Sequence, residues 1–134
     1  MDGALAADAR ALGCYDAKVS VEFRFEPNGV NPEAALIYRW EIFGPDSARL
    51  VCYVGKSKNG ARRPLRDYKR NVLRLLAGQP YRKSKPDEFR AIHRLMANAV
   101  QQQQTLVLTL LKNIAPHEDI NAEEQRLRRE HGGM

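Results

Sequence analysis

The chain has 134 residues, which is enough for one compact domain with its own core and requires no second domain. No apolar run reaches the roughly 18 residues of a membrane span, and the two cysteines lack the CxxC or Cys/His spacing of a zinc site or disulfide framework. Asp2 lies where a secretory signal would carry positive charge. We therefore expect a globular, reduced, cytoplasmic protein that does not enter membranes.

The first third of the chain alternates between short structured stretches and turns. Residues 4–13 have the composition of a short helix that ends at Gly13. Residues 18–25, KVSVEFRF, alternate apolar and polar positions as a half-buried strand does. Residues 35–43 and 49–54 are rich in β-branched and aromatic residues, and the short break GPDSA between them predicts an antiparallel hairpin.

The pattern changes to helical spacing after GKSKNGA. Apolar positions predict a helix over 65–76 that stops at Ala77-Gly78. A basic loop follows, and a second helix is predicted from Pro86 or Asp87. Residues 105–111 predict a strand and 121–131 a last, charged helix. The order predicts an α+β fold, in which helices flank a small, mainly antiparallel three-stranded sheet over 35–134, and an N-terminal extension, 1–34, contributes a further strand.

Positive charge is concentrated in one third of the chain. The formal net charge is +6, but residues 55–94 hold thirteen Lys and Arg against three acidic residues, and the rest of the chain carries −4. Such a region is the electrostatic footprint of a polyanion, because each phosphate that a cation neutralises releases counterions. Nucleic acid is therefore the leading expected partner. The alternatives are a solvated basic face and a face that binds an acidic protein.

The stretch 50–59, LVCYVGKSKN, joins an apolar strand to a lysine-rich turn. Its Gly-Lys-Ser is not a P-loop, because that loop needs a glycine five residues before Gly55, and this position is Leu50. A phosphate site here must therefore be built from side chains on another scaffold. Tyr38 and Tyr53 lie on the two strands of the predicted hairpin, and Lys56 follows the second strand.

These residues and their order resemble the GIY-YIG nuclease superfamily. Leu36-Ile37-Tyr38 stands for the first motif and Tyr53-Val54-Gly55 for the second. YVGKSKN is similar to the corresponding stretch of the excision-repair incision subunit and of small phage endonucleases. The resemblance covers residues 35–134 and implies a metal-dependent endonuclease that hydrolyses DNA. The alternative is a catalytically inactive nucleic-acid-binding module of the same fold.

The resemblance gives the hairpin residues roles in hydrolysis. Tyr38 matches the tyrosine that activates water, with Tyr53 as its hydrogen-bonding partner or as the alternate base. A free phenol is a poor base at its pKa near 10, so nearby cations must favour the phenolate. Lys56 would provide such a cation.

The resemblance also assigns an arginine and a tyrosine on the next helix. The family arginine that contacts the scissile phosphate lies seven residues past the lysine, and this count falls on Arg63. The family has a tyrosine or histidine four residues later, whereas Tyr68 lies five residues after Arg63 with Pro64 between them. Because the proline shifts the expected helix start, Arg62 and Arg66 remain substitutes for Arg63.

One carboxylate on the last helix binds a single divalent ion in the family. Glu124 is expected to hold it, because it lies three residues before the apolar Leu127, and the adjacent Glu123 is the alternate ligand. A hard oxygen ligand that leaves most of the shell to water and substrate predicts Mg²⁺ or Mn²⁺. Further contacts with DNA are expected from the basic residues Lys58, Arg62, Arg66, Lys69 and Arg70.

Overall fold

The computed structural model describes residues 21–85 and 87–134. This part of the chain forms an α+β fold, as predicted. Its elements are β1 (Arg24–Glu26), β2 (Leu36–Phe43), β3 (Arg49–Ser57), the π-helical turn η1 (Arg63–Asp67), α1 (Tyr68–Leu76), α2 (Ala91–Gln101), β4 (Thr105–Asn113) and α3 (Ile120–His131). The helix predicted over 4–13 and residues 18–20 of the first predicted strand lie outside the described residues.

The strands form one mixed sheet in the order β1-β4-β2-β3, so β3 is an edge strand. β2 pairs antiparallel with β3, which confirms the predicted hairpin, and antiparallel with β4. β1 pairs with β4 in parallel. The further strand expected from the N-terminal extension is present, but it joins the predicted three-stranded antiparallel sheet as a parallel fourth strand, so the sheet is four-stranded and mixed.

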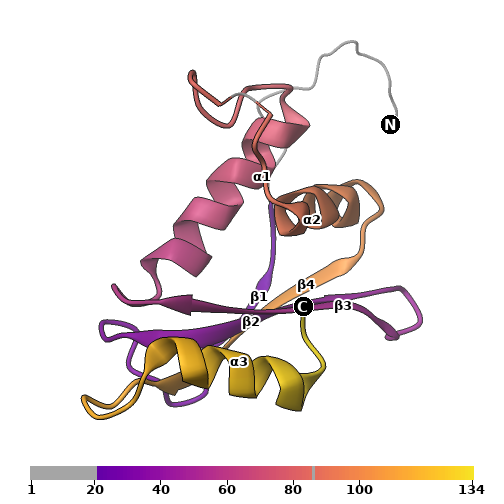
Figure 1. Ribbon diagram of the computed structural model, residues 1–134. Helices are drawn as coiled ribbons and strands as arrows, with labels where there is room; N and C mark the ends of the chain where they lie inside the picture. The colour runs from indigo at the N-terminus through magenta and orange to yellow at the C-terminus, as the bar shows by residue number, and fades with distance from the viewer. Residues whose placement is uncertain (1–20, 86) are drawn as a thin grey trace.

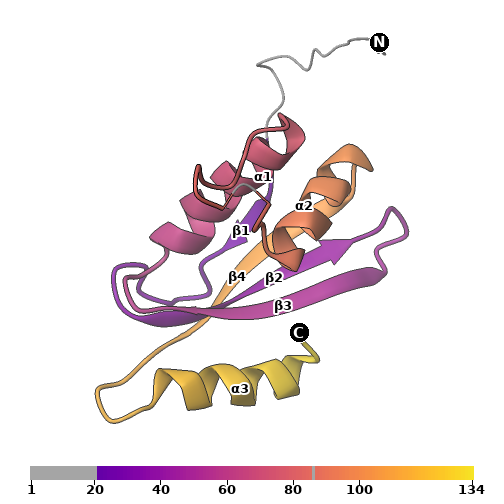
Figure 2. The ribbon, with the colours of Figure 1, turned by 45° about the horizontal axis from the view of Figure 1, so that its top comes forward.

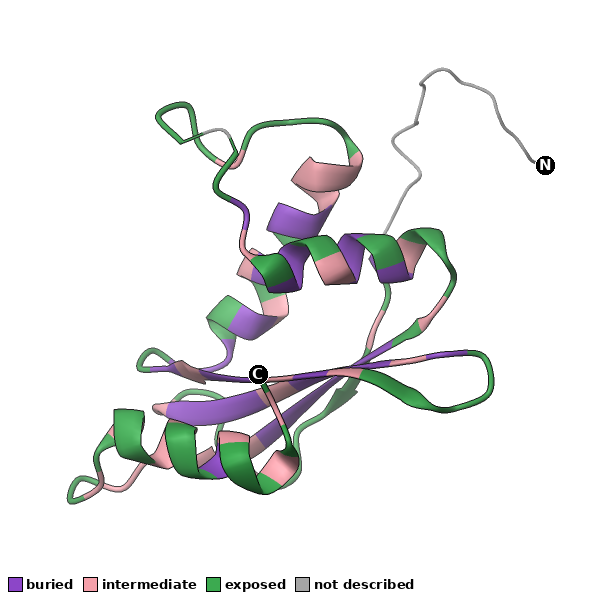
Figure 3. Ribbon diagram, turned by 45° about the vertical axis from the view of Figure 1, so that its right-hand side comes forward, coloured by how far each residue is buried: buried purple, intermediate pink, exposed green. Residues whose placement is uncertain are grey.

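Helices cover both faces of the sheet, α1 and α2 on one side and α3 on the other (Figures 1 and 2). Alternation along β2 divides its side chains between two cores. Tyr38 and Trp40 belong to the larger core under α1 and α2, whereas Ile37 packs with Leu127 under α3. Figure 3 shows the buried residues along the strands and on the inner sides of the helices.

The helix ends follow local packing. α1 ends at Leu76, and Gly78 has a left-handed φ of +69°, which confirms the predicted stop. α2 begins at Ala91, later than predicted, because Phe89 packs in the preceding loop against Tyr81. None of the helices in the described part of the chain is long and apolar enough to cross a membrane.

Candidate active site

Three tyrosine hydroxyls and one guanidinium form a hydrogen-bonded group under α1 and α2. The Oη atoms of Tyr38 and Tyr68 lie 2.7 Å apart. Nη2 of Arg90 donates to Oη of Tyr68 at 2.6 Å and to Oη of Tyr53 at 2.7 Å. The same guanidinium lies 5.4 Å and 5.6 Å from the centres of these two rings. We call these four residues the tyrosine cluster.

Gly55 creates the space for Tyr38. The two residues lie opposite each other on β3 and β2. A Cβ atom at position 55 would lie 2.6 Å from both Cζ and Oη of Tyr38, which is closer than any ordinary contact. The ring therefore lies across the backbone of β3 because residue 55 has no side chain. This contact gives the glycine of the Tyr53-Val54-Gly55 motif a steric role.

A π-helical turn brings Tyr68 to Tyr38. The backbone N–H of Tyr68 donates to the carbonyl of Arg63, five residues earlier, instead of four as in an α-helix. The turn therefore absorbs the one extra residue between Arg63 and Tyr68. Pro64 lies at its start, where a missing backbone N–H costs no helical hydrogen bond.

A basic pocket of about 350 Å³ lies where β3 runs into this turn. Four residues expected to bind phosphate line it, Lys56, Lys58, Arg62 and Arg63. We call it the lysine pocket. Of the other expected DNA contacts, Arg66 and Lys69 are exposed and line no described pocket, and Arg70 lines a neighbouring one.

Glu124 lies on the other side of the sheet from the tyrosine cluster. Side chains alternate along the edge strand β3, so Tyr53 faces α1 and α2 whereas Lys56 faces α3. Oε1 of Glu124 lies 3.7 Å from Nζ of Lys56, and Oε2 lies 3.4 Å from Nη2 of Arg128. Lys56 therefore contacts Glu124 and also lines the lysine pocket.

The alternate acid, Glu123, is held by other cations. Its Oε1 lies 2.8 Å from Arg126 and 3.0 Å from Lys112. Hydrogen bonds from these two cations lower the pKa of Glu123 to about 2. Glu124, which meets Lys56 at the edge of the sheet, is the better placed of the two acids for a role beside the lysine pocket.

The expected site residues thus fall into three groups. Tyr38, Tyr53 and Tyr68 lie together in the tyrosine cluster, and Lys56 and Arg63 share the lysine pocket. Glu124 contacts this pocket only through Lys56. The structure does not bring all of them into one described cavity.

The three tyrosines of the cluster differ in burial, and therefore in how well each could act as a base. Burial raises the pKa of Tyr38 above its usual value, and the charges of Arg63 and Arg90 offset only part of this rise. Burial also raises the pKa of Tyr68. Both rings are 1% exposed, so water does not reach them in this conformation. Tyr53 is half-buried and bonds to Arg90 rather than to Tyr38. The expected Tyr38–Tyr53 hydrogen bond is therefore replaced by a chain of three hydrogen bonds that runs from Tyr53 through Arg90 and Tyr68 to Tyr38.

Sequence reasoning missed the part played by Arg90. This residue is one of thirteen cations in the basic third of the chain, and no spacing separates it from its neighbours. Its extended backbone, with a ψ of 158° just before α2, turns its side chain back toward β3. Only a three-dimensional arrangement of the loop and the strand could have identified it.

Among the described residues, no three His, Cys, Asp or Glu side chains gather into a group that could hold a metal ion. No family model, curated protein or solved structure matches this chain.

Proposed function

We propose that this chain is a divalent-metal-dependent endonuclease of the GIY-YIG type, which hydrolyses DNA phosphodiester bonds with water activated by a tyrosine. The observation that carries the proposal is the position of Arg63. This arginine acts electrostatically on Tyr38 of the tyrosine cluster, which Arg90 holds together, and it also lines the lysine pocket. Hydrolysis of a phosphodiester requires a base for the water and positive charge on the phosphate. Both kinds of group occur in this region.

Tyr53 is the tyrosine to which we assign the proton of the attacking water. It is the most accessible of the three tyrosines in the tyrosine cluster, and its hydroxyl oxygen accepts a hydrogen bond from the Arg90 guanidinium. The buried Tyr68 accepts from the same nitrogen of Arg90 and so holds the guanidinium in place. Tyr38 in turn positions Tyr68, so we assign Tyr38 a positioning role.

The lysine pocket is the proposed place of the scissile phosphate. Arg63 is exposed at the start of the π-helical turn. Its positive charge opposes the rise in the pKa of Tyr38 that burial causes, so Arg63 lies close enough to the tyrosine cluster to act on it. A guanidinium can donate two parallel hydrogen bonds to a phosphate, and the ammonium of Lys56 adds a second cation. These two groups would stabilise the charge that develops on the phosphate.

The residues around Lys56 fit a single hard divalent ion. The carboxylate of Glu124 and the amide oxygen of Asn121 both contact Nζ of Lys56, so two side-chain oxygens already face the positive charge of this ammonium. Mg²⁺ and Mn²⁺ take such ligands and keep several waters. When bound, the ion would neutralise phosphate charge.

The test is nicking of a supercoiled plasmid with Mg²⁺, Mn²⁺ or EDTA. We expect nicking that requires the metal and that falls at least about 100-fold in Tyr53→Phe, since general bases contribute about 10²-fold or more. Glu124→Gln should lose metal-dependent nicking, and Arg129→Gln, on the exposed side of α3, should retain it. Absence of metal-dependent nicking by the wild type, or full activity of Tyr53→Phe, would contradict the proposal.

One observation favours a second candidate, a catalytically inactive nucleic-acid-binding module. Both carboxylate oxygens of Glu124 are paired with cations of the chain itself, Lys56 and Arg128. A module of this kind would retain DNA in low salt with the same salt dependence as the enzyme. Retention of DNA without nicking in either metal would favour it.

A further inference from the structure

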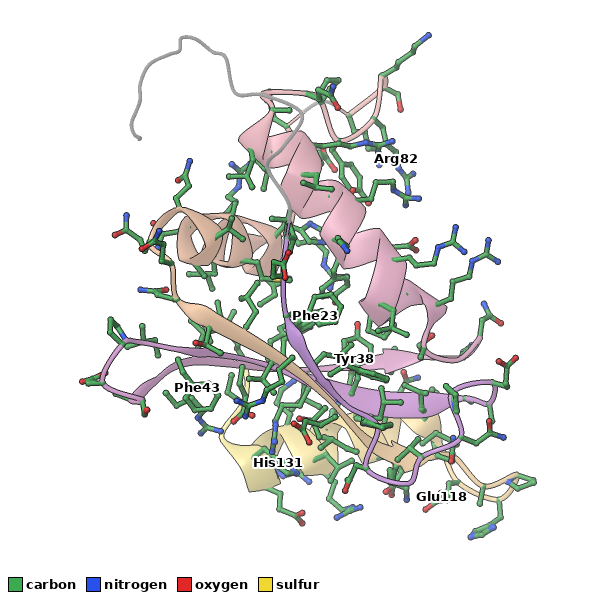
Figure 4. All side chains as sticks on the ribbon, turned by 180° about the vertical axis from the view of Figure 1, so that it is seen from behind. Phe23, Tyr38, Phe43, Arg82, Glu118 and His131 are labelled. Carbon is green, nitrogen blue, oxygen red and sulfur yellow. The ribbon has the colours of Figure 1, made fainter. Side chains whose placement is uncertain are left out.

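A second basic pocket lies between α1 and the loop that leads to α2. It has a volume of about 270 Å³ and is lined by four arginines, Arg63, Arg70, Arg82 and Arg90, together with Tyr81 and His93. We call it the arginine pocket. Arg63 lines both this pocket and the lysine pocket, so the two cavities are neighbours. Figure 4 shows Arg82 and Tyr38 on the side of the sheet that carries α1.

Most of the positive charge in the arginine pocket is uncompensated. The one acidic side chain of its lining, Asp67, lies 3.4 Å from Arg70. Within residues 21–85 and 87–134, no carboxylate pairs with Arg63, Arg82 or Arg90. Arg82 instead lies 5.1 Å from the centre of the Tyr81 ring. The pocket therefore presents hydrogen-bond donors without an internal anion to meet them.

His93 adds a buried donor without a partner. The ring is 2% exposed, and its Nδ1 accepts from the backbone N–H of Arg90 at 3.3 Å. Burial, Arg90 and Arg63 lower the pKa of His93 to about 4, so the ring is neutral at pH 7 and its proton is on Nε2. This Nε2–H has no hydrogen-bond partner in the described part of the chain. A buried donor left in this way is costly unless a ligand or water satisfies it.

We propose that the arginine pocket binds a second phosphate group of the nucleic-acid strand, adjacent to the phosphate in the lysine pocket. This inference rests on the proposed function, because it assigns a place to the same strand. The pocket volume is roughly nine times the 30 Å³ share of a water molecule, which leaves room for a phosphate and part of its sugar. Arg63, shared by both cavities, would lie between the two phosphates.

A phosphate fits this lining better than a base or a neutral ligand. Three guanidiniums without a carboxylate partner and an imidazole N–H are all donors, and a phosphate offers only acceptors. A base would need acceptors for its amino and imino groups. The one carboxylate of the lining, Asp67, already pairs with Arg70, so it is not free to accept hydrogen bonds from a base.

The first test measures how the affinity for a fluorescent ten-residue oligothymidylate depends on salt, in EDTA to prevent cleavage. Each phosphate contact on a single strand contributes about 0.7 to the slope of log K against log salt. Arg82→Gln should reduce this slope by about 0.7, and the matched control Arg129→Gln should leave it unchanged. A slope in Arg82→Gln equal to that of the control overturns this inference and leaves the proposed function standing.

The second test observes the ligand position directly. The ¹⁵N and ¹H resonances of His93 Nε2–H are followed while inorganic phosphate is added, and then the oligothymidylate. We expect a saturable shift with both, and a weaker response in Arg82→Gln. A resonance that moves with neither ligand, while the protein still retains the oligonucleotide, overturns the inference. Failure of the wild type to retain the oligonucleotide overturns both it and the proposed function.

Discussion

The two faces of the sheet treat their charged side chains in opposite ways. Under α3, most cations have a carboxylate partner from the chain itself, as in the pairs Lys112–Glu118, Lys112–Glu123, Arg126–Glu123, Arg128–Glu124 and Arg39–Glu41. Figure 4 shows Glu118 and His131 on this side. Under α1 and α2, Arg70 pairs with Asp67, but Arg90 meets two phenols, and Arg63 and Arg82 have no carboxylate partner among the described residues. The number of charges in a segment therefore does not locate a binding face, whereas the absence of internal partners does.

The faces also differ in what their buried polar groups can do. On the α3 side, the terminal nitrogens of Arg39 bond to His131 and to Glu41, which lies 3.0 Å away, although Nε of Arg39 and of Arg128 has no partner among the described residues. On the α1 side, Arg90 organises two phenols, and His93 keeps an unpaired donor. The first arrangement stabilises the fold. The second leaves the His93 donor without a partner in the described part of the chain, as the proposed phosphate site requires.

The largest expected effect on stability comes from Gly55→Ala. The added Cβ would force Tyr38 out of the tyrosine cluster, and overpacking of this kind costs about 2 to 3 kcal/mol in free energy of unfolding. Urea unfolding measures it. The control is Gly78→Ala, where the φ is positive but the surrounding space is open, and about 1 kcal/mol is expected. Equal costs at the two positions would disprove the close contact with Tyr38.

A smaller effect is expected from acid. The unfolded chain protonates His93 near pH 6.5 and the folded chain near pH 4, because burial and the charges of Arg90 and Arg63 disfavour the imidazolium. His93 therefore lowers stability as pH falls from 6.5 to 4, by about 2 kcal/mol, and has no effect above pH 7.

Urea midpoints of the wild type and of His93→Gln, taken between pH 7 and pH 4, test this expectation. The variant should lose less stability over this range than the wild type does. If the stability of the two proteins changed with pH in the same way, His93 would titrate normally. The buried Nε2–H without a partner in the arginine pocket would then be in doubt.

The smallest effect is expected on the α3 side, from Lys112→Met. Lys112 lies 2.6 Å from Glu118 and 3.0 Å from Glu123, but Arg126 still holds Glu123 when the lysine is removed. Partly exposed pairs of this kind contribute less than about 1 kcal/mol, and salt weakens them. Urea unfolding at low and high salt should show a small loss that shrinks with salt. A loss above that of Gly55→Ala would reverse the ranking of the two faces.

The sequence predicts the local parts of the fold well. The β2–β3 hairpin and the end of α1 follow from periodicity and turn residues, because these depend on neighbours in the chain. The parallel pairing of β1 with β4 joins residues about eighty positions apart, such as Phe25 and Leu108. Alternation shows which face of a strand is apolar but not which strand lies beside it.

The sequence predicts only those residues of the candidate site that belong to a recognisable motif. Tyr38, Tyr53 and Gly55 are found from their spacing on two paired strands, and the structure explains the glycine by its contact with the tyrosine ring. The π-helical turn that places Tyr68 depends on packing, since a shift of one hydrogen bond leaves no trace in composition. The direction of Arg90 depends on the backbone of a loop.

The most direct test of the difference between the two faces is a chemical-shift map of the ¹⁵N-labelled protein, recorded while a ten-residue oligothymidylate is added in EDTA. We predict that the resonances that move belong to the lysine pocket and the arginine pocket, at residues 56–59, 62, 63, 67, 68, 70, 71, 81, 82, 90 and 93. The outer surface of α3, with Arg126 and Arg129, should remain unperturbed. Shifts centred on α3, or none in either pocket, would contradict the account.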